Sequence, residues 1–319
     1  MGHVNIIVLG ANGFAGEIGK KSTVSDMTFF NLKKGDGAAT LIEPTKYPEK
    51  LSPLFYAGAM SEFAVLVVEK IDSTLGETIL MLDCLGIDKG WMILRNYIQE
   101  SQLRPLLAGT ALENYTMTED DPIKLRENIL SMATEMNNGT AATAGSVPVD
   151  SHFNVKGVGT VVLGSVIHGM VKKHDKMRVL PINETVILKS IQKHDIDCDD
   201  GIKGEHLGMA LRGIESEKLD RGYVLTTDDS VKMTKVVKDK AKIVKYWPSP
   251  LKEGMVMHIG HWMQMVPCRV KAADSGNDRF RPLLELELES EIIHRPGDDA
   301  IMMYLEGGKL RVVGKIQLN

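Results

Sequence analysis

The first 136 residues alternate short apolar runs with glycine-rich turns and segments of helical periodicity. Four apolar runs are predicted as strands, at residues 4–9, 63–68, 91–94 and 106–107. Residues 77–85 have helical spacing, with Gly86 as the C-cap. A further helix should begin at Asp121 and Pro122, with an apolar stripe of Leu125, Ile129, Met132 and Met136. Strands that alternate with helices predict an α/β domain built on a parallel sheet.

From residue 147 onward the pattern changes to short Val/Ile/Leu-rich segments separated by Gly, Pro, Asn and Asp. The clearest segments are residues 160–163, 176–180 and 185–191. Residues 284–289 alternate strictly between Leu and Glu, which predicts a strand with leucines facing inward, and 310–318 should be the last strand. Turn signals at this spacing are typical of small β-barrels or sandwiches.

The stretch between these two patterns, NNGTAATAGS, is small, polar and without periodicity, as in a linker. The fold class is therefore multidomain: an α/β parallel-sheet domain followed by two small β-barrels. The predicted boundaries are an α/β domain at 1–138, a linker at 139–146, and β-barrels at 147–229 and 230–319.

Charge and cysteine content narrow the setting. Residues 1–145 have a net charge of −6 and residues 146–319 a net charge of +2, and six lysines fall between 232 and 245. A lysine run of this kind is either a solvated strand face or a contact for a phosphate backbone. The three cysteines are far apart, which favours reduced thiols in the cytoplasm. No apolar run is long enough for a membrane span, and the N-terminus has no export signal.

The first strand leads directly into a glycine-rich loop. A strand that feeds such a loop can present backbone N–H groups to a phosphate, so the loop is a candidate nucleotide site. The candidate residues are Gly10, Asn12, Gly13 and Gly16.

Sequence motifs in the third quarter of the chain resemble the EF-Tu superfamily of translational GTPases. Residues 153–164, FNVKGVGTVVLG, resemble the F-x-I-x-G-x-G-T-V-V-T-G signature of the second domain of that family, and residues 204–214 and 220–225 match its later motifs. Residues 179–183 and 186–192 resemble the archaeal SelB branch, including a SelB-like factor proposed to serve pyrrolysyl-tRNA. The resemblance implies a P-loop-GTPase-like first domain and, as partners, aminoacyl-tRNA and the ribosome, with no membrane and no DNA. Because this sequence ends near the close of the predicted third domain, we expect the C-terminal mRNA-reading domain of SelB to be absent.

The first domain departs from the nucleotide motifs of this family. A P-loop requires a lysine and a hydroxyl at its seventh and eighth positions, where this chain has Gly16 and Glu17. The D-x-P-G-H motif is replaced by residues 43–47, EPTKY, and the guanine-reading motif by residues 95–98, RNYI. We therefore expect GTP binding and hydrolysis to be lost or weakened, with no catalytic residue and no cofactor; GTP and Mg²⁺ are implied only by the resemblance. Residues 19–22 could alternatively be a shifted P-loop remnant. Separately, a working GTP-binding elongation factor with an unorthodox P-loop is the first alternative function.

The predicted second domain keeps polar residues at positions where the resemblance places the aminoacyl end of tRNA. These candidates are Asp150, Ser151, His194, His206 and Arg212. The resemblance assigns Asp150 to the α-amino group and one of the two histidines to the side-chain pocket; a surface or capping role is the alternative for each. The candidates for contact with the tRNA backbone are Lys172, Lys173, Lys232 and Lys235.

Other residue groups do not suggest a further site. His258, His261 and Cys268 lack a fourth ligand at usable spacing, so no metal site is expected. A paralogue that uses its barrels only for protein docking is the remaining alternative function.

Overall fold

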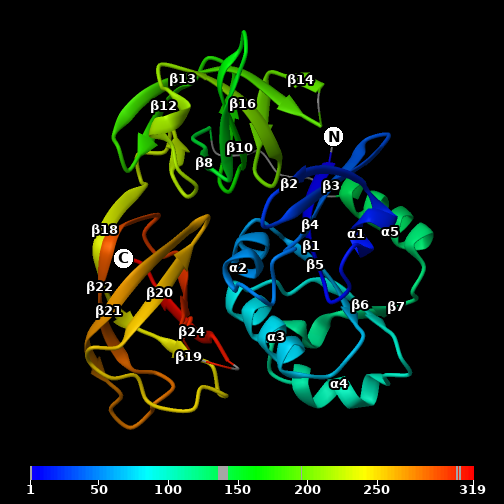
Figure 1. The fold of residues 1–319 in the computed structure, drawn as a ribbon, viewed down its shortest axis with the longest axis vertical. Coiled ribbons are helices and arrows are strands. Elements are labelled where there is room, and N and C mark those ends of the chain that lie inside the picture. The colour runs from blue at the N-terminus through cyan, green and yellow to red at the C-terminus, as the bar shows by residue number, and fades with distance from the viewer. Residues whose placement is uncertain (1, 136–142, 195, 307, 309) are drawn as a thin grey trace. The chain divides into compact units, whose positions relative to one another are not determined.

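The computed structural model describes residues 2–135, 143–194, 196–306, 308 and 310–319. The chain divides into two compact units, Met1–Thr140 and Ala141–Asn319 (Figure 1). The first unit is an α/β domain with a sheet that contains parallel strands, and the second consists of curled antiparallel sheets. These observations confirm the predicted fold class. None of the helices in the described part of the chain is long and apolar enough to cross a membrane.

A seven-stranded sheet forms the centre of the first unit, in the order β2-β3-β4-β1-β5-β6-β7. Strands β4, β1, β5, β6 and β7 run parallel, whereas β2 and β3 are antiparallel additions at one edge. Their bounds are β1 Gly2–Leu9, β2 Lys20–Val24, β3 Thr28–Lys34, β4 Gly37–Glu43, β5 Phe63–Val68, β6 Gly90–Leu94 and β7 Thr116–Thr118. The fully buried patterns of β4 and β5 are typical of parallel strands covered on both faces.

Helices cover both faces of this sheet. They are α1 Phe14–Ile18, α2 Ser52–Ala59, α3 Ser73–Leu85, α4 Glu100–Leu107 and α5 Pro122–Glu135, with a short 3-10 turn at Ala111–Asn114. Helices α1 and α5 bury their apolar side chains against Val4, Ile6 and Val8 of β1. Gly58 of α2 packs on the opposite face, since a Cβ there would lie 3.9 Å from Ile7 Cδ1 and 2.4 Å from Leu85 Cδ1.

The strand predicted at residues 106–107 is wrong, because these residues form the end of helix α4. The carboxamide oxygen of Gln102 accepts the Gln99 N–H at 2.8 Å, which caps the start of the helix. Leu103 and Leu107 are buried four residues apart, as the helical repeat requires. The strand that follows β6 in the sheet is β7 instead.

The other two predicted helices are present, with the predicted C-cap for α3 and the predicted start for α5. Gly86 is the C-cap of α3 in the left-handed conformation, with φ 72°. Helix α3 begins four residues before the predicted start, because the Asp72 carboxylate accepts the N–H groups of Thr74 and Leu75. The Asp121 carboxylate caps α5 by accepting the N–H of Ile123 at 2.9 Å. Met136, the last residue of the predicted stripe, lies outside the described residues.

The second unit contains two large antiparallel sheets. The first has eight strands, β8-β17-β12-β13-β16-β10-β9 with β14 beside β13, and a two-stranded ribbon of β11 and β15 accompanies it. The strand bounds are β8 Ser146–Pro148, β9 Ser151–Val155, β10 Gly159–Ser165, β11 Met170–Lys172, β12 Lys176–Leu180, β13 Glu184–Lys193, β14 Ile196–Cys198, β15 Asp200–Ile202, β16 His206–Arg212 and β17 Val224–Thr226, with a 3-10 turn at Ser216–Lys218. The predicted linker included Ser146, which instead begins β8; residues 139–142 lie outside the described residues.

The second large sheet has seven strands in the order β18-β22-β21-β20-β23-β24-β19. The strand bounds are β18 Lys232–Lys240, β19 Lys242–Ile243, β20 Val256–His261, β21 Gln264–Asp274, β22 Leu283–His294, β23 Asp299–Met303 and β24 Val312–Gln317. Leu284, Leu286 and Leu288 are buried, as the alternation predicted.

The two large sheets contact each other through both apolar and polar groups. Leu180 and Val224 from the first sheet share a buried cluster with Val231 and Ile293. Nearby, the Arg295 guanidinium lies 3.2 Å from His168 Nδ1. These contacts make the second unit one compact body.

Candidate functional site

In the first unit, the carboxyl ends of β1, β4, β5 and β6 and the loops that follow them form the candidate nucleotide site. This edge is where open α/β sheets bind ligands. The loop after β1 begins at Gly10, which has φ +93°. A Cβ at Gly10 would lie 1.8 Å from the carbonyl oxygen of Val67, so only glycine fits where the loop crosses β5.

The backbone N–H groups of this loop are bound by a carboxylate of the protein itself. Glu43, the last residue of β4, accepts the Gly13 N–H at 3.1 Å and the Ala15 N–H at 2.7 Å. Glu43 is buried, with only 7 % of its surface exposed. Burial raises the pKa of Glu43, and the two N–H bonds and Lys21 oppose that rise.

The four predicted nucleotide residues all lie on or beside this loop. All four residues are exposed, and Gly16 is on α1, where a Cβ would lie 3.3 Å from the Phe30 ring. Their nucleotide role stays a prediction. The helix after the loop has only five residues, so it offers little of the aligned peptide dipole that attracts phosphate.

The alternative of a shifted P-loop at residues 19–22 is wrong. Gly19 ends helix α1, and Lys20 and Lys21 begin strand β2, where they pair with Asn31 and Phe30 of β3. A P-loop lysine must sit in a loop that enters a helix, and these two lysines are in a hairpin instead.

Arg95 occupies the position of the guanine-reading motif and is held by two acidic side chains. Its guanidinium binds both carboxylate oxygens of Asp120, at 2.8 and 2.9 Å, and Glu69 Oε1 at 2.9 Å. The guanidinium carbon also lies 5.2 Å from the centre of the Phe14 ring. Hydrogen bonding to Arg95 lowers the pKa of Asp120. Asp120 lies in the loop that follows β7, and its carboxylate binds Arg95 of the segment after β6.

Tyr47 stands where the D-x-P-G-H motif has its histidine. Its hydroxyl donates to the Thr74 carbonyl at 3.0 Å and accepts from the Thr78 hydroxyl at 3.2 Å. The side chain is therefore bound to the start of helix α3. Glu43, Arg95 and Tyr47 each use internal partners at this edge of the sheet.

In the second unit, two of the predicted pocket residues meet on the face of the sheet opposite to the core. His206 pairs with Ser165 across β10, and Gln192 pairs with Gly208, which sets His194 beside His206. Leu207 and Met209 point the other way, into the core. Burial and, to a lesser degree, the neighbouring His194 lower the pKa of His206 to about 4, so its ring is neutral at pH 7.

Asp150 and Ser151 lie near the start of β9, two strands away from His206 on β16 and three from His194 after β13. Ser151 pairs with Leu163, which in turn pairs with Gly208. The Asp150 carboxylate is buried and lies 3.5 Å from Arg221, whose Nε also donates to the Asp150 carbonyl at 3.0 Å. In this conformation the Asp150 carboxylate faces an arginine of the same unit, and its role at an amino group stays a prediction.

Arg212 lies far from the histidines. It ends β16, six residues beyond His206, which separates the two Cα atoms by about 20 Å along the strand. The outer face between them carries only Gly208 and Ala210 from β16. The structure therefore brings His194 and His206 together and places Arg212 at the opposite end.

A buried ion pair beneath the two histidines was not predicted from the sequence. The Lys193 ammonium lies 2.6 Å from Glu205 Oε2, with side-chain exposures of 17 % and 4 %. The same Glu205 oxygen accepts the Ile202 N–H at 2.8 Å. Lys193 precedes His194 and Glu205 precedes His206, so the pair fixes the strand ends that carry the histidines. The sequence does hold a signal for this ion pair, because a residue of opposite charge directly precedes each of the two histidines.

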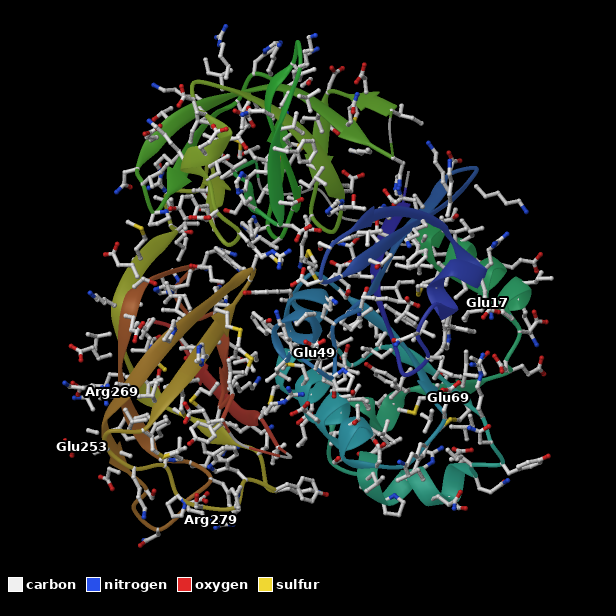
Figure 2. All side chains as sticks on the ribbon, in the orientation of Figure 1. Glu17, Glu49, Glu69, Glu253, Arg269 and Arg279 are labelled. Carbon is white, nitrogen blue, oxygen red and sulfur yellow. The ribbon has the colours of Figure 1, made fainter. Side chains whose placement is uncertain are left out.

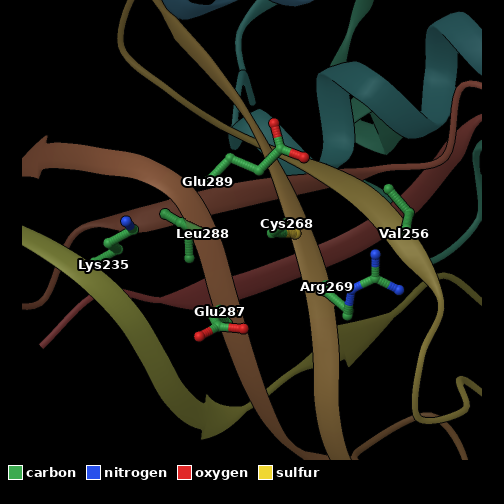
Figure 3. A pocket seen from close by; sticks show the side chains of 7 residues that line it. All are labelled: Lys235, Val256, Cys268, Arg269, Glu287, Leu288 and Glu289. Carbon is green, nitrogen blue, oxygen red and sulfur yellow. The ribbon is translucent and has the colours of Figure 1, made fainter.

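The predicted backbone-contact lysines are all exposed. Lys172 and Lys173 are at the end of β11, and Lys232 and Lys235 are on the edge strand β18. Lys235 also lines a shallow pocket of about 200 Å³ on β20, β21 and β22 (Figure 3), together with Val256, Cys268, Arg269, Glu287, Leu288 and Glu289. Two basic and two acidic side chains surround this pocket, so it has no strong preference for anions.

Within the described residues, no three His, Cys, Asp or Glu side chains are placed to hold a metal ion. His258 is on β20 opposite Pro267, and Cys268 is buried beside it on β21. Burial raises the pKa of the Cys268 thiol to about 12.

Comparison with known proteins supports a relationship to elongation factors. Residues 159–226 match the family model for elongation factor Tu domain 2. An uncharacterized protein of Methanocaldococcus jannaschii is 33% identical over 95% of this chain and 94% of its own length. The selenocysteine-specific elongation factor of the same organism is 27% identical over 90% of this chain and 68% of its length.

Solved structures agree in fold. Translation elongation factor SelB from Methanococcus maripaludis, in complex with the GTP analogue GppNHp, superposes with a TM-score of 0.84 at 21% identity, over 98% of this chain and 78% of that chain. A bacterial selenocysteine-specific elongation factor, EF-Sec, gives a TM-score of 0.82 at 19% identity, over 100% of this chain and 58% of that chain.

Proposed function

We propose, from the premise that this chain belongs to the EF-Tu/SelB superfamily of elongation factors, that it binds aminoacyl-tRNA without depending on GTP. The observation that carries the proposal is the contrast between the two units. The sheet that matches elongation factor Tu domain 2 keeps its signature strands, whereas the nucleotide edge of the first unit is filled by internal contacts.

The aminoacyl end would enter at the outer face of the first sheet in the second unit, at the end marked by His194 and His206. A neutral His206 ring can both donate and accept a hydrogen bond, which suits an uncharged polar side chain. The acceptor-arm phosphates would contact the exposed lysines of the same unit, including Lys172 and Lys232. Binding should then weaken steeply as salt rises.

Loss of ordinary GTP binding is the second part of the proposal. The lysine and the hydroxyl of a P-loop are replaced by Gly16 and Glu17, and Asp120 is bound to Arg95. An equilibrium titration with labelled GTP and Mg²⁺ checks this part. Micromolar binding would contradict it and would favour a working GTPase.

The substrate we propose is a specialised aminoacyl-tRNA, of which pyrrolysyl-tRNA and selenocysteyl-tRNA are the first to test. The proposed setting is the cytoplasm, with the ribosome as the acceptor of the delivered tRNA. The relatives include selenocysteine-specific elongation factors, which supports a specialised cargo over the common set.

An ester-protection assay tests the main proposal. The rate of hydrolysis of the aminoacyl ester is measured across purified aminoacyl-tRNAs, with and without the protein and with and without GTP. We expect protection of a narrow set of esters that does not change when GTP is added. Equal binding to charged and uncharged tRNA would contradict the proposal.

Two matched variants locate the binding face. His206→Ala removes a ring at the proposed pocket, and Arg212→Ala removes a charge about 20 Å away on the same strand. We expect the first to weaken ester protection about tenfold, equivalent to one lost hydrogen bond and its contacts. Arg212→Ala should change protection less. If Arg212→Ala weakened ester protection more than His206→Ala did, the pocket would lie at the other end of β16.

A further inference from the structure

The loop after β1 already holds an anion, and this anion is a side chain of the protein. The two carboxylate oxygens of Glu43 separately accept the N–H groups of Gly13 and Ala15, at 3.1 and 2.7 Å. The N–H groups of Phe14 and Gly16, each one residue further along the chain, donate instead to the backbone carbonyls of Ala11 and Gly13. The loop thus presents two N–H groups to one acceptor, in the way that a phosphate cradle does.

The length of the Glu43 side chain makes this contact possible. Glu43 ends β4, whose backbone is fixed by its parallel pairing with β1. Aspartate at the same backbone position would place its carboxylate about 1.5 Å short, one carbon–carbon bond, and beyond hydrogen-bonding distance of both N–H groups. The replacement of the family's aspartate by glutamate therefore has a specific structural consequence.

We propose that Glu43 is the internal ligand of this loop and that its carboxylate keeps phosphate groups out. The inference rests on the proposed loss of nucleotide binding and gives it a physical cause beyond the missing lysine. Two charge-assisted hydrogen bonds satisfy the N–H groups. A phosphate that approached them would meet a buried negative charge. The loop itself has no lysine, and Lys21 on β2, which acts electrostatically on Glu43, is not part of it. The loop then keeps its form without a nucleotide.

Hydrogen exchange of individual amides tests the contact directly in the full-length protein. In the wild type, the Gly13 and Ala15 amides should be protected. In Glu43→Asp they should exchange at least about tenfold faster, because the carboxylate no longer reaches them. The Phe14 and Gly16 amides are internal controls and should change less, since their acceptors are backbone carbonyls. Unchanged exchange at Gly13 and Ala15 would overturn the proposal.

Thermal unfolding with inorganic pyrophosphate tests whether the carboxylate excludes anions. We expect pyrophosphate to raise the Tm of Glu43→Ala by roughly 2–4 °C at ten times its Kd, and to leave the wild type unchanged. Glu49→Ala is the matched control, because Glu49, labelled in Figure 2, is an exposed carboxylate of the same unit, whereas the loop amides bind Glu43. It should behave as the wild type does.

Two results of the pyrophosphate experiment would overturn the proposal. One is an equal rise in the wild type and in Glu43→Ala, and the other is no rise in Glu43→Ala. If that variant does not fold, Glu43→Gln replaces it, since it keeps the length and removes the charge. Neither readout involves tRNA, so the outcome is separate from that of the ester-protection assay.

Discussion

Replacing Lys193 by methionine should destabilise the second unit, because it leaves the Glu205 carboxylate buried without its cation. The two charged atoms are 2.6 Å apart, and the Glu205 side chain is only 4 % exposed. Breaking a buried pair from one side typically costs ~3–5 kcal/mol. Here the Ile202 N–H still binds the carboxylate, and Asp200 is a second, exposed partner of the lysine at 3.5 Å. We therefore expect a loss of about 2–3 kcal/mol.

Urea unfolding at pH 7.5 measures this loss, and a double-mutant cycle isolates the pair. Lys193→Met combined with Glu205→Gln should recover at least about 1 kcal/mol relative to the sum of the single variants. The control is Lys218→Met, which breaks an exposed ion pair in which Lys218 Nζ lies 2.8 Å from Glu184 Oε1. That change should be below about 1 kcal/mol. If Lys193→Met stays within about 0.5 kcal/mol of the wild type, the reasoning on the buried pair is wrong.

Three further predictions concern the loop, the pocket and the lysine strand. Gly10→Ala should lower the free energy of unfolding of the first unit by more than ~3 kcal/mol in urea, because φ is +93° and the new Cβ would collide with the Val67 carbonyl. The pKa of His206 is lowered to about 4 in the folded state, so between pH 6.5 and 4 the unfolded state binds more protons and stability falls as pH falls. The free energy of unfolding, measured in urea at pH 7 and at pH 4.5, should fall by up to about 3 kcal/mol. In His206→Gln the contribution of His206 to this pH dependence should be absent. Replacing Lys232 and Lys235 by glutamine should reduce the salt slope of aminoacyl-tRNA binding by about 1–2 units in filter binding between 50 and 200 mM salt; an unchanged slope would exclude both from the phosphate contact.

Much of the fold could be predicted from local sequence signals. The apolar run at 63–68 became β5 with the same bounds, and the Leu–Glu alternation placed Leu284 and Leu286 in the core. These signals work because burial on one or both faces of a strand imposes a pattern of period two or a continuous run. The strand predicted at residues 106–107 was wrong because two adjacent leucines are compatible with either a strand or a helix. The glutamines that cap the start of α4, Gln99 and Gln102, lie outside this apolar run.

The candidate sites were less predictable, since their contacts join residues far apart in sequence. The position of Gly10 and the loss of the P-loop lysine can be read from the motif alone. The contact of Glu43 with Gly13 and Ala15 cannot, because it depends on the parallel pairing of β1 and β4. The chain gave no local signal that Arg95 would bind Asp120, 25 residues away. A motif shows which residues differ from the family pattern, whereas the contacts made by the residues now present are seen only in the folded structure.

The replacements at the carboxyl edge of the first sheet share one physical logic. A nucleotide site needs unsatisfied N–H donors, a free carboxylate for the base and a side chain that can orient water. In this chain Glu43 accepts two of the loop N–H groups, Arg95 in the segment after β6 is bound by Asp120, and Tyr47 is bound to helix α3. Polar groups with internal partners do not need a ligand to compensate their burial. The three contacts therefore agree with the proposed loss of nucleotide binding, because they would let the first unit keep its form without a ligand.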